Sequence, residues 1–414
     1  MNIKKSGFKL TFSNWGLYIL ALICILFMIA EIINNRFWLA DFEVYYKAAE
    51  RILRSESLYR IAADKHYVFK YSPTSAIFFI PFLIFPFAVA KYVYWIFLTS
   101  IIVTGFYLSV KLIKPSLLDE RNAKPYNTII LFATLILAVH FLRELHLGQV
   151  NYLLFFIFML ALYLYNEKKS ILFSLLLAIS IFIKPFTLIF IPYLILKRKY
   201  LELILFTGFS AALFLLPFLF YGSVEITLHQ YQLWITELQI ELSNKQGLFN
   251  NANHTIFSIF ARYTPIGFIL VNSTMILTYQ LVLLSGIGLA LLWFIKIDGN
   301  AISESQQDYY SVIEFSLLIS LIPLLAYTSE NAFIYAQLLV FIILLYFKKL
   351  KQYEKILAIV AFAFIGGNFS ELFGKTLSKI IDDISLISVG TLILFCLVFA
   401  MRKRGSFKNQ EINH

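Results

Sequence analysis

The stretch WGLYILALICILFMIAEII at residues 15–33 is followed closely by ADFEVYYKAA at residues 40–49. The first stretch is an apolar run long enough to cross a bilayer as a helix. The second has two carboxylates, two tyrosines and a lysine just beyond that run. An acid beside a membrane can do base chemistry, or it can be an ordinary solvated loop charge. The two stretches therefore predict a membrane-spanning helix with a polar group of side chains at its end.

Similar apolar runs recur along the whole chain, separated by short polar breaks. Of the 414 residues, 60% are hydrophobic and 14% are charged, whereas roughly a quarter of a soluble chain is charged. This composition excludes an ordinary soluble enzyme. We predict an all-α integral membrane protein, a polytopic bundle of about 11–13 helical segments, which forms a single domain over residues 1–414.

The net charge of +11 could indicate a nucleic-acid partner. The basic residues cluster at the ends of apolar runs, which is the positive-inside pattern of membrane proteins. These clusters are Lys4, Lys5 and Lys9; Lys197 to Lys199; Lys348, Lys349 and Lys351; and Arg402 to Arg404. No nucleic acid is therefore expected, and both termini are predicted to be cytoplasmic. The two cysteines, Cys24 and Cys396, lie inside apolar runs and predict neither a disulfide nor a metal site.

Alternating crossings place two large loops outside the membrane, at residues 34–73 and 222–253. In the first loop, apolar residues recur at nearly helical spacing between Asp41 and Leu58, which predicts a short amphipathic helix on the membrane surface. The apolar segment 74–87 is too short to span, so we expect a partial or re-entrant helix there.

The apolar segment 170–196 carries Lys184 and Pro185 in its middle, which predicts two short helices that meet near the external side. This topology puts the most polar stretches near the membrane on one external face. They are Asp41, the segment 143–151, Lys184 and the segment 250–254. Because charges at membrane depth are costly and usually face protein or water-filled cavities, we predict a site at the outer interface.

Asp41 is the candidate general base of this site. A positioned carboxylate can take the proton of a sugar hydroxyl as that hydroxyl attacks an anomeric carbon. The alternative is structural, because an aspartate before a helix is favoured as an N-cap. Glu43 would not share the face of Asp41 on a helix, so a metal-binding carboxylate pair is a weak interpretation.

Cations near the membrane surface are candidates to hold a phosphate leaving group. Arg143, His146 and Lys184 are the first three, and Arg262 is a fourth. Under the alternative interpretation, Arg143 extends from a helix end to the interface, and His146 is a hydrogen-bonded interface residue. Lys184 is harder to explain in this way, because it interrupts an apolar run.

Amide side chains are candidates to bind sugar hydroxyls, and ordinary helix-start or loop-capping roles are the alternative. They are Gln149, Asn151, Asn250 and Asn253, with His254 beside them. The sequence has no Gly-rich phosphate loop, HExxH, paired CxxC or GxSxG motif, so an ATP-driven pump, a zinc enzyme and a serine hydrolase have no support.

Five motifs occur in the same order as in a known family of membrane enzymes. The sequence resembles glycosyltransferase family 87, the polyprenol-phosphate-mannose-dependent α-(1,2)-mannosyltransferases of the GT-C superfamily. The motifs are Asp41-Phe42-Glu43-Val44-Tyr45-Tyr46-Lys47-Ala48-Ala49 with Leu58-Tyr59, Phe69-Lys70-Tyr71-Ser72-Pro73, Gly148-Gln149-Val150-Asn151, Ile183-Lys184-Pro185, and Asn250-Asn251-Ala252-Asn253-His254 with Arg262.

The resemblance implies a GT-C-type helical bundle that transfers a sugar from a lipid phosphate with inversion, without a metal or other cofactor. Asp41 matches the catalytic acid position, and the match implies donor-phosphate binding by Arg143, Lys184 and Arg262. Sugar and acceptor contacts would come from Tyr45, Tyr71, His146, Gln149, Asn151, Asn250 and Asn253.

The chain departs from the family pattern at three places. Ser72 replaces the first proline of a pair, Leu58 stands where a proline is common, and the segment 327–331 lacks a common histidine. These departures leave the acceptor and the sugar open.

We expect a multi-pass enzyme of the cell membrane with its active site on the external face. Its partners would be a polyprenyl-phosphate sugar, a glycolipid or glycan acceptor, and membrane lipids. Two other functions stay open, namely a lipid or solute transporter and an oligosaccharide ligase or polymerase that uses a lipid-diphosphate donor. A transporter would often show inverted repeats, and none is visible in the sequence.

Overall fold

The computed structural model describes residues 14–64, 67–118, 123–245, 247–251, 253–296, 304–368 and 370–407. Throughout these ranges the ordered elements are helices, and no strand occurs. Among the described residues, seven helices are long and apolar enough to cross a membrane, and five further apolar segments are shorter. The predicted all-α polytopic membrane fold is thus confirmed.

The helices follow one another with short connections. Their bounds are α1 (Trp15–Ile33), α2 (Ala40–Leu53), η1 (Ala62–Asp64), α3 (Pro73–Ile77), η2 (Ile80–Ile84), α4 (Phe87–Ile113), η3 (Pro115–Leu118), α5 (Ala123–Leu147), α6 (Asn151–Asn166), α7 (Ser170–Ile183), η5 (Pro185–Ile189), α8 (Phe190–Leu196), α9 (Tyr200–Leu215), α10 (Phe218–Tyr221), α11 (Val224–Lys245), α12 (Ile256–Tyr263), η6 (Pro265–Ile269), α13 (Ser273–Lys296), α14 (Glu304–Leu325), η7 (Glu330–Ala336), α15 (Gln337–Tyr346), η8 (Phe347–Lys349), α16 (Gln352–Gly366), α17 (Ser370–Asp383) and α18 (Leu386–Lys403).

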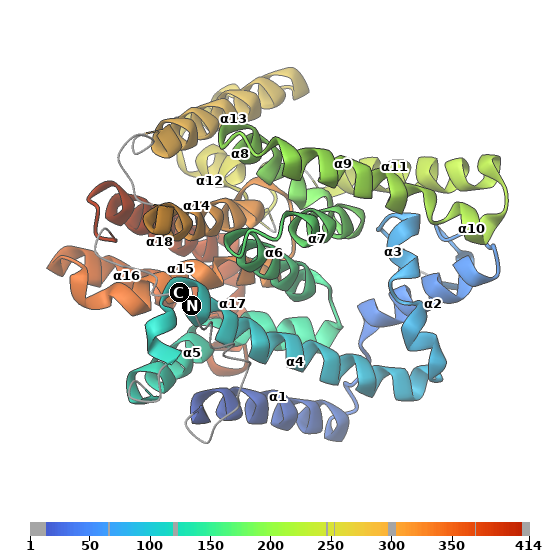
Figure 1. Cartoon of the computed structure of the whole chain (residues 1–414), viewed down its shortest axis with the longest axis horizontal. Helices are drawn as coiled ribbons and strands as arrows, with labels where there is room; N and C mark the ends of the chain where they lie inside the picture. The colour runs from blue at the N-terminus through green and yellow to red at the C-terminus, as the bar shows by residue number, and fades with distance from the viewer. Residues whose placement is uncertain are drawn as a thin grey trace.

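Most long helices run in similar or opposite directions, and α2, α3 and α10 gather at one end of the molecule, at the right of Figure 1. The core of the bundle is formed by α4, α5, α6, α14 and α15, whose facing side chains are buried. By contrast, α9 and α13 are apolar but bury little of their surface. Apolar helices with this exposure are suited to contact lipid.

The predicted amphipathic helix in the first loop is present as α2. Its apolar side packs against protein rather than lying on a membrane surface, since Phe42 is fully buried. The ring of Phe42 stacks on Tyr94 of α4 with 4.1 Å between ring centroids. Tyr46, one helical turn further on, donates a hydrogen bond to the carbonyl of Phe85. These contacts fix α2 against the start of α4.

The predicted partial helix consists of two short pieces, α3 and η2. Ser72 caps α3, because its hydroxyl oxygen accepts a hydrogen bond from the amide of Ser75. The same hydroxyl donates to the carbonyl of Phe182 at the end of α7, at 2.7 Å. The predicted break at Lys184 is also present, since α7 ends at Ile183 and η5 begins at Pro185. Ser72 thus connects the start of the partial helix α3 with the break at the end of α7.

The second predicted loop contains a long helix, α11, which the sequence analysis did not resolve. Tyr231 of α11 stacks on Phe214 at the end of α9, with ring centroids 4.3 Å apart. Glu237 forms an ion pair with Arg60 in the first loop, and Gln230 accepts from the amide of Leu58. The helix is held by these contacts with distant segments, so α11 covers the first loop.

The close packing of α16 on α5 gives a test of the fold. A Cβ atom at Gly366 would overlap the backbone oxygen of Ile136, so Gly366→Ala should lower the stability by about 1–3 kcal/mol. Gly208, in α9, has open space around its Cα atom, and Gly208→Ala should be neutral or stabilising by up to about 1 kcal/mol. Thermal unfolding of both purified variants in detergent checks this. Equal midpoints would contradict the α5–α16 packing.

Candidate functional site

Asp41 is the second residue of α2, and its side chain is partly buried. The N-cap of the helix is Leu39, whose backbone is left-handed with φ 49°, and no side chain caps this end. The structure therefore gives no support to the capping role that was the alternative for Asp41.

The turn between α5 and α6 brings Gln149 to Asp41. Gly148 has φ +70°, a conformation that favours glycine. A Cβ atom at Gly148 would lie 3.0 Å from the Cβ atom of Phe42, so the glycine lets the turn approach α2 closely. Hydrogen bonding by the side chain of Gln149 favours the ionised form of the Asp41 carboxyl group and lowers its pKa. The glycine of the Gly148-Gln149 motif is thus needed because the turn packs closely against the motif that begins at Asp41.

A second carboxylate, Glu144, lies fully buried near the end of α5. It accepts hydrogen bonds from Asn151 Nδ2 at 2.7 Å, from the backbone amide of Tyr152 at 3.1 Å, and from Asn331 Nδ2. Asn331 also donates to Gln149 Oε1, at 2.6 Å. Sequence analysis missed Glu144 as a site residue. The available signal was an acid near the end of an apolar run, where an ionisable group is costly.

Lys184 completes this group. Its ammonium donates to Asn151 Oδ1 at 2.6 Å and lies 6.0 Å from the ring centroid of Tyr71. The hydroxyl of Tyr71 is hydrogen-bonded to that of Tyr45, with 3.0 Å between the oxygens. We call the following set the Asp41 cluster. It contains Asp41, Tyr45, Tyr71, Glu144, Gln149, Asn151, Lys184 and Asn331.

Burial raises the pKa of the Asp41 carboxyl group above its ordinary value. The hydrogen bond from Gln149 and the positive charges of Lys184 and Lys70 act in the opposite direction, because they stabilise the carboxylate. Lys70 belongs to the second motif, but its proximity to Asp41 was not predicted. The pKa of Tyr45 is raised well above its ordinary value, mainly by burial, so this phenol stays protonated and can donate a hydrogen bond.

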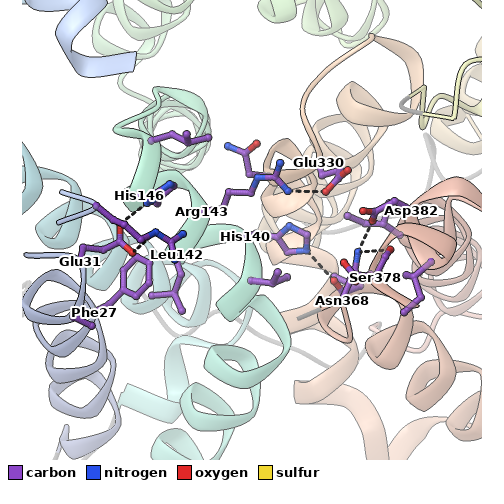
Figure 2. Close-up of a pocket in the computed structure, with 18 of the residues that line it drawn as sticks. Phe27, Glu31, His140, Leu142, Arg143, His146, Glu330, Asn368, Ser378 and Asp382 are labelled. Carbon is purple, nitrogen blue, oxygen red and sulfur yellow. Dashed lines mark hydrogen bonds and ion pairs between the residues drawn. The ribbon is translucent and has the colours of Figure 1, made fainter. Parts of the chain in front are cut away.

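Two other predicted residues, Arg143 and His146, line a cavity of about 850 Å³ beside the Asp41 cluster. Figure 2 shows their contacts with carboxyl groups, an ion pair of Arg143 with Glu330 at 2.8 Å and a hydrogen bond between His146 Nδ1 and Glu31 at 2.5 Å. Neither pair was predicted, because the partners lie far away in the sequence.

The remaining predicted residues surround the start of α18. Arg262 donates to the carbonyls of Asp383 at 2.7 Å and Asn253 at 3.0 Å, and to Ser385 Oγ at 2.5 Å. His254 Nδ1 lies 2.9 Å from the same Ser385 oxygen. These bonds fasten the chain around α12 to the junction of α17 and α18.

The two predicted asparagines of this segment differ in their surroundings. Asn253 is buried, and its Oδ1 accepts from the hydroxyl of Thr255 at 2.7 Å. Asn250 is exposed. The segment meets the Asp41 cluster through η7, because His254 Nε2 lies 3.5 Å from Glu330 and the next residue, Asn331, contacts Gln149. In the part of the chain that the structure describes, no group of three His, Cys, Asp or Glu residues could hold a metal ion.

The fold and the site together define a polytopic helical membrane protein that holds a carboxylate, a lysine and several amides at one end of its bundle. A family model, glycosyltransferase family 87, matches residues 69–321, which is more than half of the chain. The chain therefore belongs to glycosyltransferase family 87 and is a membrane glycosyltransferase, which confirms the resemblance and is consistent with the GT-C superfamily. Asp41 lies before the matched residues. The searches of curated proteins and of solved structures found no match.

The buried carboxylate of Glu144 gives a second test. Glu144→Ala leaves donors of Asn151, Tyr152 and Asn331 without their acceptor, at a cost of about 1–3 kcal/mol for each donor that finds no other partner. Glu43→Ala, in a half-exposed ion pair, should cost at most about 1 kcal/mol. Unfolding of both variants in detergent measures the difference, and similar losses would mean that Glu144 does not hold these segments together.

Proposed function

We propose that this glycosyltransferase moves a hexose, with mannose as the first candidate, from a polyprenyl-phosphate donor to a glycolipid or glycan acceptor. The reaction would take place at the external face of the cell membrane, with both termini in the cytoplasm. The observation that carries the proposal is the placement of a partly buried carboxylate, Asp41, in one cluster with a lysine. Membership in a glycosyltransferase family favours an enzyme over a transporter.

Asp41 would act as general base. A hydroxyl oxygen of the acceptor attacks the anomeric carbon, its proton passes to the Asp41 carboxylate, and the bond from that carbon to the phosphate oxygen breaks. Polyprenyl phosphate leaves with the electron pair of the broken bond. Attack opposite to the leaving group inverts the anomeric centre. The raised pKa of Asp41 suits this role, because a more basic carboxylate accepts a proton more readily.

Lys184 would hold the donor phosphate, since positive charge close to a developing phosphate dianion stabilises it. Lys70 is a further candidate, because its charge acts on the same carboxylate. Arg143 and Arg262 stay predictions for the same role. Both guanidinium groups already have protein partners, a carboxylate for Arg143 and two carbonyls and a hydroxyl for Arg262.

Sugar hydroxyls would be positioned by Tyr45, Tyr71, Gln149 and Asn151, whose polar groups surround Asp41 and Lys184. Asn250, Asn253 and His146 remain candidates for acceptor contacts. A ligase or polymerase with a lipid-diphosphate donor would use the same base and cation, so the donor must be compared directly. Activity with a lipid-diphosphate glycan alone would favour that alternative.

Replacing the base is the first test of this function. Asp41→Asn should fold normally but lower transfer from radiolabelled polyprenyl-phosphate mannose to a host glycolipid extract by at least about 100-fold. The matched control is Glu43→Gln, because Glu43 is two residues away in the same helix and is bound to Lys47. The control should keep its activity. Substantial transfer by Asp41→Asn would contradict the assignment of the base.

The dependence on pH is the second test. Transfer requires the ionised Asp41, so activity should fall as the pH decreases through the raised pKa of Asp41. Gln149→Leu removes a hydrogen bond that lowers this pKa, and the acid limb of kcat/KM should therefore move to higher pH. The exposed Gln232→Leu serves as control and should leave the limb unchanged. A limb that does not move in Gln149→Leu would contradict the coupling.

A further inference from the structure

No step described above is placed in the cavity beside the Asp41 cluster, although two of its lining residues, Arg143 and His146, are candidates for substrate contacts. It lies between α1, α5, η7, α16, α17 and the start of α18, and its volume of about 850 Å³ is in the range of small-molecule sites. In Figure 2, Glu31 and His146 lie on one side of it, Asn368 and Asp382 lie on the opposite side, and His140 lies between them.

The charges around this cavity are balanced or slightly negative. Two arginines line it, Arg36 and Arg143, together with the three carboxyl groups of Glu31, Glu330 and Asp382. Arg143 is paired with Glu330 at 2.8 Å, and Arg36 lies 3.8 Å from Glu31. Because no positive charge is in excess, the cavity offers little attraction to a phosphate group. The donor phosphate is better matched to Lys184.

The residues that line the cavity nevertheless offer both hydrogen-bond donors and hydrogen-bond acceptors. Burial and the charge of Glu330 raise the pKa of Asp382 to about 6, so this group exchanges a proton near neutrality and can donate or accept. Asn331 is completely buried and lines the cavity. Among the described residues, no donor reaches its Oδ1 atom. Buried polar atoms normally have a partner, and a ligand hydroxyl group could supply it after a rotation of the Asn331 side chain, since Oδ1 itself is closed to the cavity in this structure.

Asn331 also connects the cavity with the general base. Its Nδ2 atom donates to Gln149 Oε1 at 2.6 Å, and the side chain of Gln149 in turn favours the ionised form of Asp41. Asn151, which accepts from Lys184, also donates to Gln149 Oε1 at 2.8 Å, so the cavity and the lysine are connected to the base through the same group of amides.

We propose that this cavity binds the acceptor through its uncharged, hydroxyl-rich sugar end. The proposal rests on the function proposed above, and it assigns to Arg143 and His146 a place on the acceptor side. The acceptor sugar can be carried by a lipid or be free, and both have the same chemistry at the end that enters the cavity.

A variant that fills the cavity distinguishes an effect on acceptor binding from an effect on donor binding. Ser378 is buried and lines the cavity, whereas the neighbouring Leu377 is exposed and does not. Ser378→Phe should raise the acceptor KM at least tenfold and leave the slow hydrolysis of the donor by water, and the donor KM, unchanged. Leu377→Phe and Ser378→Ala are the controls and should behave as wild type. Equal losses of hydrolysis and transfer, or no change in either, would overturn the proposal.

A binding measurement tests whether the cavity binds a neutral sugar, even if the proposed donor is not the true substrate. Saturation-transfer NMR with the purified full chain would compare methyl α-mannoside and octyl α-mannoside with mannose 6-phosphate. The neutral glycosides should bind to wild type and to Leu377→Phe but not to Ser378→Phe, and the phosphate should not bind. Binding of only the octyl compound would identify a lipid-carried acceptor. Equal binding of the neutral glycosides to Ser378→Phe, or preferred binding of the phosphate, would overturn the proposal.

If wild type uses no polyprenyl-phosphate sugar, then the donor proposed above is wrong. A loss of glycoside binding in Ser378→Phe would still support a neutral-sugar site in this cavity.

Discussion

The arrangement at the end of the bundle depends on one buried carboxylate. Glu144 has no contact with solvent, so its oxygens must receive hydrogen bonds from protein. The donors come from the first residues of α6 and from η7, which are far apart in the sequence. Asn151, which is held by Glu144, in turn fixes Lys184 by accepting a hydrogen bond from its ammonium group. The position of the lysine relative to Asp41 therefore follows from the need to satisfy a group that touches neither substrate in the proposed reaction.

The polar groups at this end divide according to their charge. In the Asp41 cluster, Lys184 is hydrogen-bonded to the neutral Asn151, and its charge favours the ionised form of Asp41. In the adjoining cavity, Arg143 and His146 are each in direct contact with a carboxylate. An arginine that binds a phosphate must first give up its ion pair, which adds to the cost of binding. The two regions are thus suited to different ligands.

Local sequence patterns predicted the elements that depend on local chemistry. The amphipathic period gave α2, and Lys184-Pro185 marked the break after α7, because proline cannot continue a helix. The apolar runs gave the spans. The sequence patterns did not predict contacts between distant segments. Examples are the hydrogen bond of Asn331 to Glu144 and the stacking of Tyr231 in α11 on Phe214. No period or motif records which side chains meet after folding, so Asn331 and Lys70 were not recognised as neighbours of the predicted site.

The segment η7 carries two adjacent residues that face different surroundings. Glu330 is bound to Arg143 and lies close to His254, while Asn331 is bound to Glu144 and Gln149. Because Glu330 and Asn331 are adjacent in one short helix, we expect a displacement of one side chain to shift the other. Occupation of one region should then change the affinity of the other, and by thermodynamic linkage the effect is equal in both directions. The adjacency of Glu330 and Asn331 in η7 would thus couple the two proposed binding events.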